Sequence, residues 1–271
     1  MATDHSKYEP YENLHKPVGR FDGGACLYEH EYYYQQRNSC SYRWQAHHRA
    51  TGSDRALYGT LGQGISAPSP GEAATLLRNR ALATAPGPVT TSAAGKKYRL
   101  VTGQPFRTAF SPWPNNAHHL IPDAQLMNGI FSLAADLPTV EDLIVQGLLV
   151  NQYNLHHWKN MMILPQRKQE GCDLGLPTHP RGDSHPAYSA KVRDGVDLAL
   201  KPYKKVVEQV ADGEPHDTVD PVNVIQALET LSESVHTSIV AMKPRILGAC
   251  NQNGDISIGV MTPFVSTTPG V

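Results

Sequence analysis

The stretch Asn116-Ala117-His118-His119-Leu120-Ile121-Pro122 decides how the rest of this chain is interpreted. It places two histidines side by side, directly before a short apolar pair and a proline. Because neighbouring residues of a strand point to opposite sides, the two rings can do separate work at one strand end. One can hold a metal ion while the other handles a proton. A second copy, Ala46-His47-His48, lacks the apolar pair and the proline, and we interpret its histidines as surface residues.

Three further segments follow this doublet in order. A short apolar strand is expected from Asn160 to Leu164, ended by Pro165. The segment Leu176-Pro177-Thr178-His179 comes next, and Gly182-Asp183-Ser184-His185-Pro186-Ala187-Tyr188 then opens a helix. Serine before a proline suits the start of a helix, so we expect Ser184 to cap it. Strand, strand and helix in this order predict a ββα arrangement.

The combination resembles the AHH family of HNH and endonuclease VII-type (His-Me finger) nucleases. Such domains are common as toxin modules of bacterial polymorphic toxin and secretion systems. The resemblance covers residues 105–205. It implies an α+β fold with a His-Me finger (ββα-metal) core elaborated with helices. It also implies a metal-dependent endonuclease that cleaves DNA with little sequence specificity, using one divalent metal ion (Mg, Zn, Ni or Mn). An immunity protein and a secretion-system or chaperone partner are the interaction partners expected of such a toxin.

The resemblance assigns a role to each candidate residue. His118 and His185 are expected as metal ligands, His119 as the general base, and Asn160 as the residue that binds across the ββα turn and orients that base. His179 is a candidate further ligand. His179 and His185 are six positions apart, so they cannot share a helix face, and His179 is expected in the loop before the helix. Tyr188 is interpreted as a packing residue of that helix.

Charge supports a nucleic-acid partner in one part of the chain. Residues 151–205 contain nine Lys and Arg against five Asp and Glu, whereas residues 206–271 contain two against eight. Basic side chains in the first segment can contact backbone phosphates, which supply affinity without sequence preference. A solvated basic face is the alternative interpretation. The candidate phosphate contacts are Lys159, Arg167, Lys168 and Arg181.

Two other functions fit the same residues. Histidine clusters can be purely structural, so a non-catalytic, metal-stabilised binding module is one alternative. An RNA-directed nuclease toxin is the other, because the chemistry acts on the phosphate that both nucleic acids share. His156 and His157, just before the second strand, are interpreted as solvated or strand-end histidines rather than site residues.

The chain divides at a Pro- and Ala-rich stretch over residues 85–95. Residues 1–90 are predicted to form a separate loading or targeting domain, with a helix over 71–84. Residues 95–205 form the nuclease-like core, with a strand over 98–101 and a helix over 139–149 that Thr139 and Asp142 cap. Residues 206–271 are a helical extension packed on the core. Its main helix starts at Asp220-Pro221, and no periodicity follows Lys243.

Cysteine spacing and hydropathy bear on disulfide bonds, membrane insertion and localisation. The four cysteines form no CxxC pair and suggest no disulfide scaffold, although a Cys26–Cys40 bridge is possible. We expect no membrane insertion, because no apolar stretch is long enough to span a bilayer. The N-terminus lacks the apolar core of a secretory signal. We therefore expect a protein made in the cytoplasm whose export, if any, does not use a cleaved signal. The resemblance to toxin modules implies that it is secreted in this way and acts in the cytoplasm of a target cell.

Overall fold

The computed structural model describes residues 24–27, 34–58, 65–66, 97–98, 106–109, 112–179 and 185–260. Its elements are mostly helices with two small sheets, an α+β arrangement as expected. In chain order they are α1 (Tyr42–Thr51), α2 (Arg55–Tyr58), β1 (Ile65–Ser66), β2 (Lys97–Tyr98), β3 (Asn115–His119), α4 (Asp123–Ala134), α5 (Pro138–Val150), η3 (Trp158–Asn160), β4 (Met161–Pro165), α6 (Lys168–Leu174), α7 (Pro186–Ala199), η4 (Lys201–Tyr203), α8 (Lys204–Ala211), α9 (Pro221–Ala241) and α10 (Lys243–Asn251).

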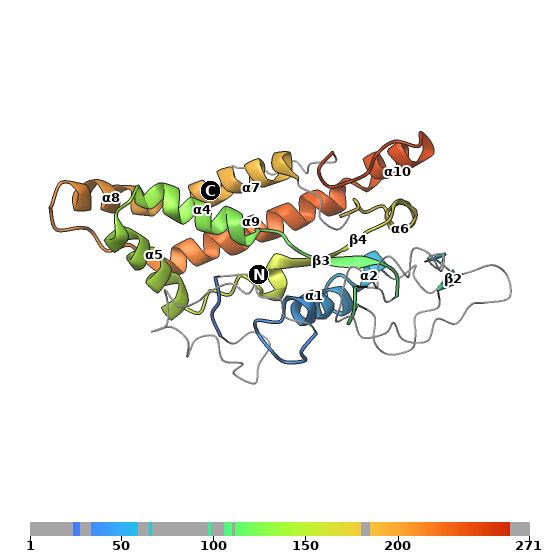
Figure 1. Ribbon diagram of the computed structural model, residues 1–271, viewed down its shortest axis with the longest axis horizontal. Helices are drawn as coiled ribbons and strands as arrows, with labels where there is room; N and C mark the ends of the chain where they lie inside the picture. Colours follow the sequence, from blue (N-terminus) through green and yellow to red (C-terminus); the bar gives the residue numbers. More distant parts are fainter. Residues whose placement is uncertain are drawn as a thin grey trace.

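The pair β3 and β4 lies at the centre of the described structure. The strands are antiparallel, with His118 opposite Met162 and His119 opposite Met161. Every residue of β4 is buried; α1 packs against both strands, and on the other face Tyr188 of α7 contacts His118 of β3. Figure 1 shows this layering, with α4, α7 and α9 on one side of the strands and α1 on the other. Alternation along β3 therefore sends its two histidines into different layers.

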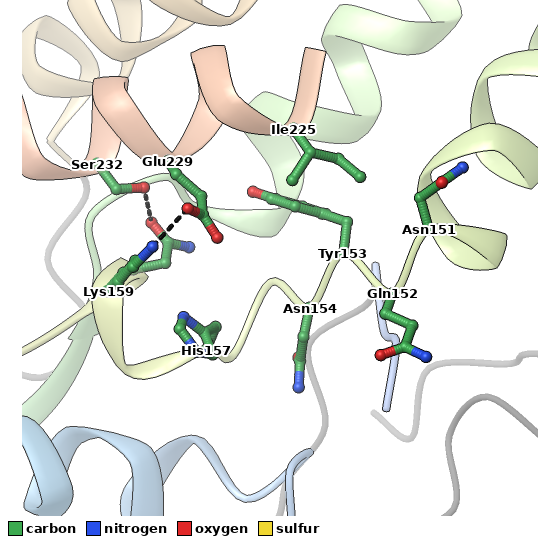
Figure 2. Close-up of a pocket in the computed structure, with 10 residues that line it drawn as sticks. Asn151, Gln152, Tyr153, Asn154, His157, Lys159, Ile225, Glu229 and Ser232 are labelled. Carbon is green, nitrogen blue, oxygen red and sulfur yellow. Dashed lines mark hydrogen bonds and ion pairs between the residues drawn. The ribbon is translucent and has the colours of Figure 1, made fainter. Parts of the chain in front are cut away.

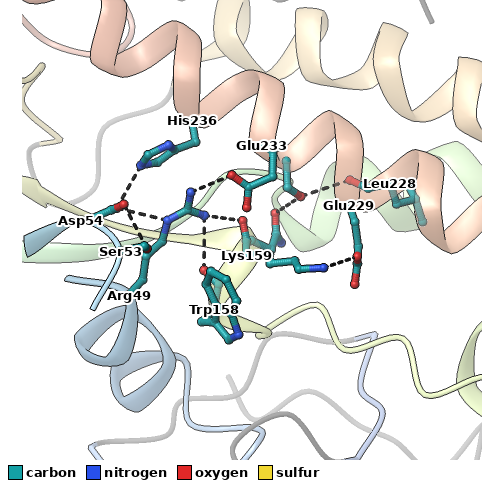
Figure 3. A network of polar contacts seen from close by, with 11 residues as sticks. Arg49, Ser53, Asp54, Trp158, Lys159, Leu228, Glu229, Glu233 and His236 are labelled. Carbon is teal, nitrogen blue, oxygen red and sulfur yellow. Dashed lines mark hydrogen bonds and ion pairs between the residues drawn. The ribbon is translucent and has the colours of Figure 1, made fainter. Parts of the chain in front are cut away.

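A buried arginine joins the N-terminal helices to the rest of the core. The guanidinium of Arg49 on α1 donates to Asp54 at 3.1 Å, to Glu233 on α9 at 3.0 Å and to the carbonyl of Lys159 at 2.6 Å. His236 of α9 lies 2.9 Å from the same Asp54 carboxylate. Figure 3 shows how this network spans α1, η3 and α9.

The expected boundary near residue 90 does not separate two cores among the described residues. Ala25, Leu27, Ala46 and Tyr58 belong to the same buried cluster as the central strands. The physical reason is that α1 covers the face of β3 and β4 that the C-terminal helices leave open. The predicted helix over 71–84 and the stretch 85–95 lie outside the described residues, as do residues 99–101 of the predicted strand, while 97–98 form β2.

The long C-terminal helix forms as predicted, and its stripe packs on the core. The Asp220 side chain accepts from the Val222 amide at 3.0 Å and caps α9. Leu228, Val235 and Ile239 are fully buried against α5, α7 and η3. The stripe differs at its start, where Val222 is exposed and Val224 is buried instead.

Several expected helix boundaries are wrong in detail. The helix α5 forms, but Leu137 is its N-cap and Pro138 its first residue, so the Thr139–Asp142 pattern does not cap it. His185 takes the N-cap position expected for Ser184, which lies outside the described residues. Residues after Lys243, expected to lack a helix, form α10.

The disulfide pairing also corrects the sequence interpretation. Cys172 of α6 is bonded to Cys250 of α10, and the considered Cys26–Cys40 bridge is not formed. Widely spaced cysteines meet because α10 folds back onto α6, which the sequence spacing could not reveal. Among the described residues, no helix has both the length and the apolar composition needed to cross a membrane.

Candidate metal centre and histidine strand

Three histidines from three different segments meet at one point. His118 comes from β3, His179 from the loop after α6, and His185 from the N-cap of α7. One ring nitrogen of each lies within 4.8 Å of the others, and Nε2 of His179 is 3.0 Å from Nε2 of His185. Nitrogens bound to one tetrahedral zinc ion at ~2.0–2.1 Å lie roughly 3.3 Å apart. The donor set therefore fits a divalent metal ion.

The imidazole of His118 is held in place by Tyr188. The Tyr188 hydroxyl donates to the Leu120 carbonyl at 2.6 Å, and its oxygen lies 3.2 Å from Nε2 of His118. Since the hydroxyl proton is used on Leu120, its oxygen acts as the acceptor toward His118, which places the ring proton on Nε2. Nδ1 then carries the lone pair that can bind a metal. Fixing a ligand's tautomer in this way is typical of the groups around metal-bound histidines.

Burial keeps the His118 ring neutral. Its side chain is 5% exposed, and desolvation lowers its pKa well below the ordinary value, with His179 and His185 lowering it further. A neutral imidazole is the form that binds metals. The ring is therefore ready for coordination across the neutral pH range without first losing a proton.

A pair of amide side chains positions His179. The Asn116 amide donates to the backbone carbonyl of His179 at 2.7 Å and lies 3.1 Å from its Nδ1. Gln166 in turn donates to the Asn116 side-chain oxygen at 3.0 Å. Because the amide nitrogen is a donor, Nδ1 accepts and the ring proton lies on Nε2, which faces His185, so a metal bound at Nε2 would displace that proton. His179 thus lies in the loop before α7, as its spacing from His185 predicted.

His119 points to the opposite face of β3. Its Nε2 lies 2.9 Å from Nδ1 of His156, and the ring of Tyr42 on α1 packs against both imidazoles. The side chain is 7% exposed, and burial lowers its pKa to about 4. His156 is fully buried, and the Asn154 side chain accepts from its backbone amide at 2.9 Å. The interpretation of His156 as a solvated residue is therefore wrong.

Asn160 binds across the strand ends. Its side-chain oxygen accepts from the Ile121 amide at 2.7 Å and from Ser232 at 2.9 Å. Its amide donates to the carbonyls of Ile121 at 3.0 Å and Leu155 at 2.8 Å. These bonds use both amide hydrogens and both lone pairs of the side-chain oxygen, and none of them is made to His119.

The basic residues expected to contact phosphates are engaged within the protein. Lys159 pairs with Glu229 at 2.6 Å, Arg167 with Glu170, and Lys168 donates to Asn253 at 2.8 Å. Arg181 lies outside the described residues. These contacts favour the alternative interpretation, in which the three described basic side chains belong to a solvated face and are paired within the protein.

The copy of the doublet at 46–48 is not a surface feature either. His47 and His48 lie half-buried on α1, where His47 stacks on Trp44 and His48 stacks on Trp158. Burial lowers the pKa of His47 to about 4. The helical repeat of apolar residues in this segment is too weak to have predicted α1, the helix that half-buries His47 and His48.

A separate polar pocket of about 130 Å³ opens beside Asn160. Figure 2 shows its lining residues and the Lys159–Glu229 ion pair on its wall. None of the three clustered histidines lines it. It is lined by Asn151, Gln152, Tyr153, Asn154, His157, Lys159, Asn160, Ile225, Glu229 and Ser232.

Sequence reasoning missed three positioning residues of the site: Tyr188 as a hydrogen-bonding group, Asn116 and His156. Tyr188 follows His185 by three positions, so a helix starting there brings it to the same side, and this spacing was a usable signal.

Comparison of the chain with protein-family models, with curated proteins and with solved structures finds no match.

Proposed function

We propose that this chain is a metal-dependent nuclease that hydrolyses phosphodiester bonds of DNA. The observation that carries the proposal is the cluster of three imidazoles, with a fourth histidine on the neighbouring position of the same strand. Three protein ligands are typical of catalytic zinc sites, which keep a coordination position open, whereas structural sites close with four. The order β3, β4, α7, with a histidine opening the helix, supports the finer proposal of a His-Me finger core.

His118, His179 and His185 would hold the ion. A divalent metal bound there would neutralise charge on the phosphate and on the leaving oxygen. His119 would be the general base; burial lowers its pKa to about 4, so its ring is neutral at pH 7, the form that accepts a proton, although a pKa this low makes it a weak base. His156 holds His119 through its Nδ1, and Asn160 holds the backbone after it. General-base catalysis contributes about 10²–10⁴-fold when the pKa of the base lies near the working pH.

The resemblance to AHH nucleases extends the proposal to a biological role. The protein would be a toxin delivered to competing cells, with an immunity protein as its neutralising partner and a secretion system or chaperone for delivery. RNA stays an alternative substrate, because the ligands act on the phosphate group. Toxicity of the full chain in bacteria, with chromosomal DNA and RNA examined for loss, distinguishes the two substrates.

A specific observation favours one other function, a metal-stabilised binding module without catalysis. His119 is 7% exposed and lies on the face of β3 away from the three-histidine cluster. A base must come within hydrogen-bond reach of the water it deprotonates, directly or through one water. In this alternative the three histidines fix the fold and His119 is a core residue.

Plasmid cleavage tests the proposal. Purified protein, freed of metal and then given Mg²⁺, Mn²⁺, Ni²⁺ or Zn²⁺, is incubated with supercoiled plasmid beside His118→Ala, His119→Ala and His48→Ala. We expect the wild type to cleave the plasmid, and His48→Ala, the matched change in the other doublet, to cleave it as well. We expect His118→Ala and His119→Ala to lose cleavage. Equal cleavage by wild type and His119→Ala contradicts the role of His119. No cleavage with any metal, together with His118-dependent metal binding, favours the binding module.

A further inference from the structure

The loop that delivers His179 is held by the C-terminal segment of the chain. The Thr178 amide donates to the Ile256 carbonyl at 2.9 Å, and the Ile258 amide donates back to the Thr178 carbonyl at 2.8 Å. On its other side, the His179 amide donates to the Pro165 carbonyl of β4 at 2.7 Å. One of the three metal ligands is therefore fixed between the central strand and the segment that follows α10.

This segment is packed tightly against α6. A Cβ built on Gly171 of α6 would lie 2.6 Å from Cδ1 of Ile256 and 3.0 Å from Cγ2 of Thr178. Ile256 and Ile258 are each 1% exposed. Only glycine at position 171 allows this close approach, so the segment, α6 and the His179 loop are packed directly against one another.

The Cys172–Cys250 disulfide closes the same unit covalently. It joins α6 to α10 across 78 residues, and Figure 1 shows the two helices side by side at one end of the molecule. Cys172 precedes His179 by seven positions, and Cys250 precedes Ile256 by six. The bond therefore ties together the two chain segments whose backbone bonds place His179.

We propose that the Cys172–Cys250 disulfide is a redox-sensitive positioning element for the three-histidine metal site. With the bond intact, α10 holds residues 256–258 against Thr178 and keeps Nε2 of His179 beside His185. With the bond broken, α10 loses its covalent tie to α6, the His179 loop gains freedom, and metal affinity falls. His118 and His185 stay on β3 and α7, so a weaker site persists.

The chemical step is ordinary thiol–disulfide exchange with an external dithiol. The dithiol supplies two electrons and two protons, the Sγ–Sγ bond breaks, and Cys172 and Cys250 become thiols while the dithiol forms its own disulfide. Loss of outer positioning groups lowers metal affinity about 10- to 100-fold in other sites, and we expect a change of that size here.

Zinc binding to the full chain tests this inference, which rests on the proposed metal site. Zn²⁺ dissociation constants are measured by competition with a chromophoric chelator, without reductant, for the oxidised wild type and for the double variant Cys172→Ser/Cys250→Ser. The double variant Cys26→Ala/Cys40→Ala is the matched control, because both of these cysteines are buried and outside the disulfide. We expect the control to match the wild type and the serine variant to bind about 10- to 100-fold more weakly.

The outcomes separate the two proposals. If the oxidised wild type does not bind Zn²⁺, or binds it equally after His118→Ala, the proposed metal site fails. If the wild type binds through His118 and the serine variant binds equally well, the redox inference fails. A second variant, Ile258→Pro, removes the amide that donates to Thr178 and keeps both cysteines. If the serine variant does not fold by circular dichroism, wild-type affinity in Ile258→Pro overturns the inference, and weakened affinity supports it.

Discussion

At the scale of single residues, the two histidines of the doublet differ in what surrounds them rather than in their chemistry. His118 lies with Tyr188 and two other imidazoles in the helical layer, while His119 lies with His156 and Tyr42 in the layer of α1. Strand alternation predicted this separation from sequence alone. The sequence also predicted the helix that carries His185 and Tyr188, whereas α1, which brings Tyr42 to His119, was not predicted.

Removing one hydroxyl tests the account of His118. The change Tyr188→Phe leaves the ring in place but frees Nε2 of His118 and the Leu120 carbonyl from their shared partner. We expect Zn²⁺ affinity to fall about 10-fold or more, because the tautomer that presents Nδ1 is no longer favoured. Competition titration measures it, with Tyr203→Phe, another buried tyrosine, as control. Unchanged affinity in Tyr188→Phe contradicts the tautomer assignment.

A buried histidine also makes stability depend on pH. Burial lowers the pKa of His47 to about 4, whereas the unfolded chain has the ordinary value of 6.5. Between these two values the unfolded state binds a proton that the folded state does not, so the free energy of unfolding falls as pH decreases from about 6.5 to about 4. The slope due to one such histidine is at most about 1.4 kcal/mol per pH unit, and partial exposure of His47 reduces it.

Urea denaturation of metal-free protein at several pH values between 4.5 and 7.5 measures this dependence. We expect His47→Gln to flatten the profile relative to wild type. The control is His216→Gln, in the exposed connection between α8 and α9, which should leave the profile unchanged. Parallel profiles for wild type and His47→Gln would show that His47 is protonated in the folded protein.

At the scale of elements, the sequence predicted a helix correctly where its capping residues and its apolar stripe both indicated the same helix. The helix α9 has a capping aspartate, a proline at its first position and a stripe buried on the core, and all three are legible in the sequence. The helices α4, α6 and α10 were missed. Pro122 caps α4 without a side-chain hydrogen bond, and α10 contains a proline and a glycine, so local patterns argued against them.

Tertiary contact explains the glycine within α4. A Cβ on Gly129 would lie 2.6 Å from Cγ1 of Val196, so the missing side chain lets α4 approach α7 closely. Gly129→Ala should therefore destabilise the protein by about 1–3 kcal/mol through overpacking. Thermal unfolding of the oxidised protein measures it. Gly248→Ala in α10 is the matched control, because no atom lies within 4 Å of its Cβ, and it should be neutral or stabilise by about 0.5–1 kcal/mol. Equal effects of the two changes would refute the packing argument.

At the scale of the whole molecule, the chain folds around its central strands from both ends of the sequence. The Cys26 amide donates to the Tyr153 carbonyl at 3.1 Å, and the Leu155 amide donates to the Cys26 carbonyl at 2.7 Å. Arg49 reaches Glu233 of α9, which lies 184 positions further along the chain. The division predicted near residue 90 rests on the Pro- and Ala-rich stretch there, and composition carries no information about such long-range contacts.

This arrangement predicts that a fragment of residues 95–271 does not fold independently. Without α1, one face of β3 and β4 is exposed, His119 loses the cover of Tyr42, and the carboxylate of Glu233 loses its arginine partner. Exposing this apolar surface removes hydrophobic stabilisation from a fold of a kind that is usually stable by only about 5–15 kcal/mol. We expect fragment 95–271 to lack a cooperative urea transition and to bind Zn²⁺ only weakly, whereas fragment 24–271 keeps both properties. A cooperative transition and wild-type Zn²⁺ affinity in fragment 95–271 would restore the boundary near residue 90, and would mean that α1 is an accessory to the core rather than a part of it.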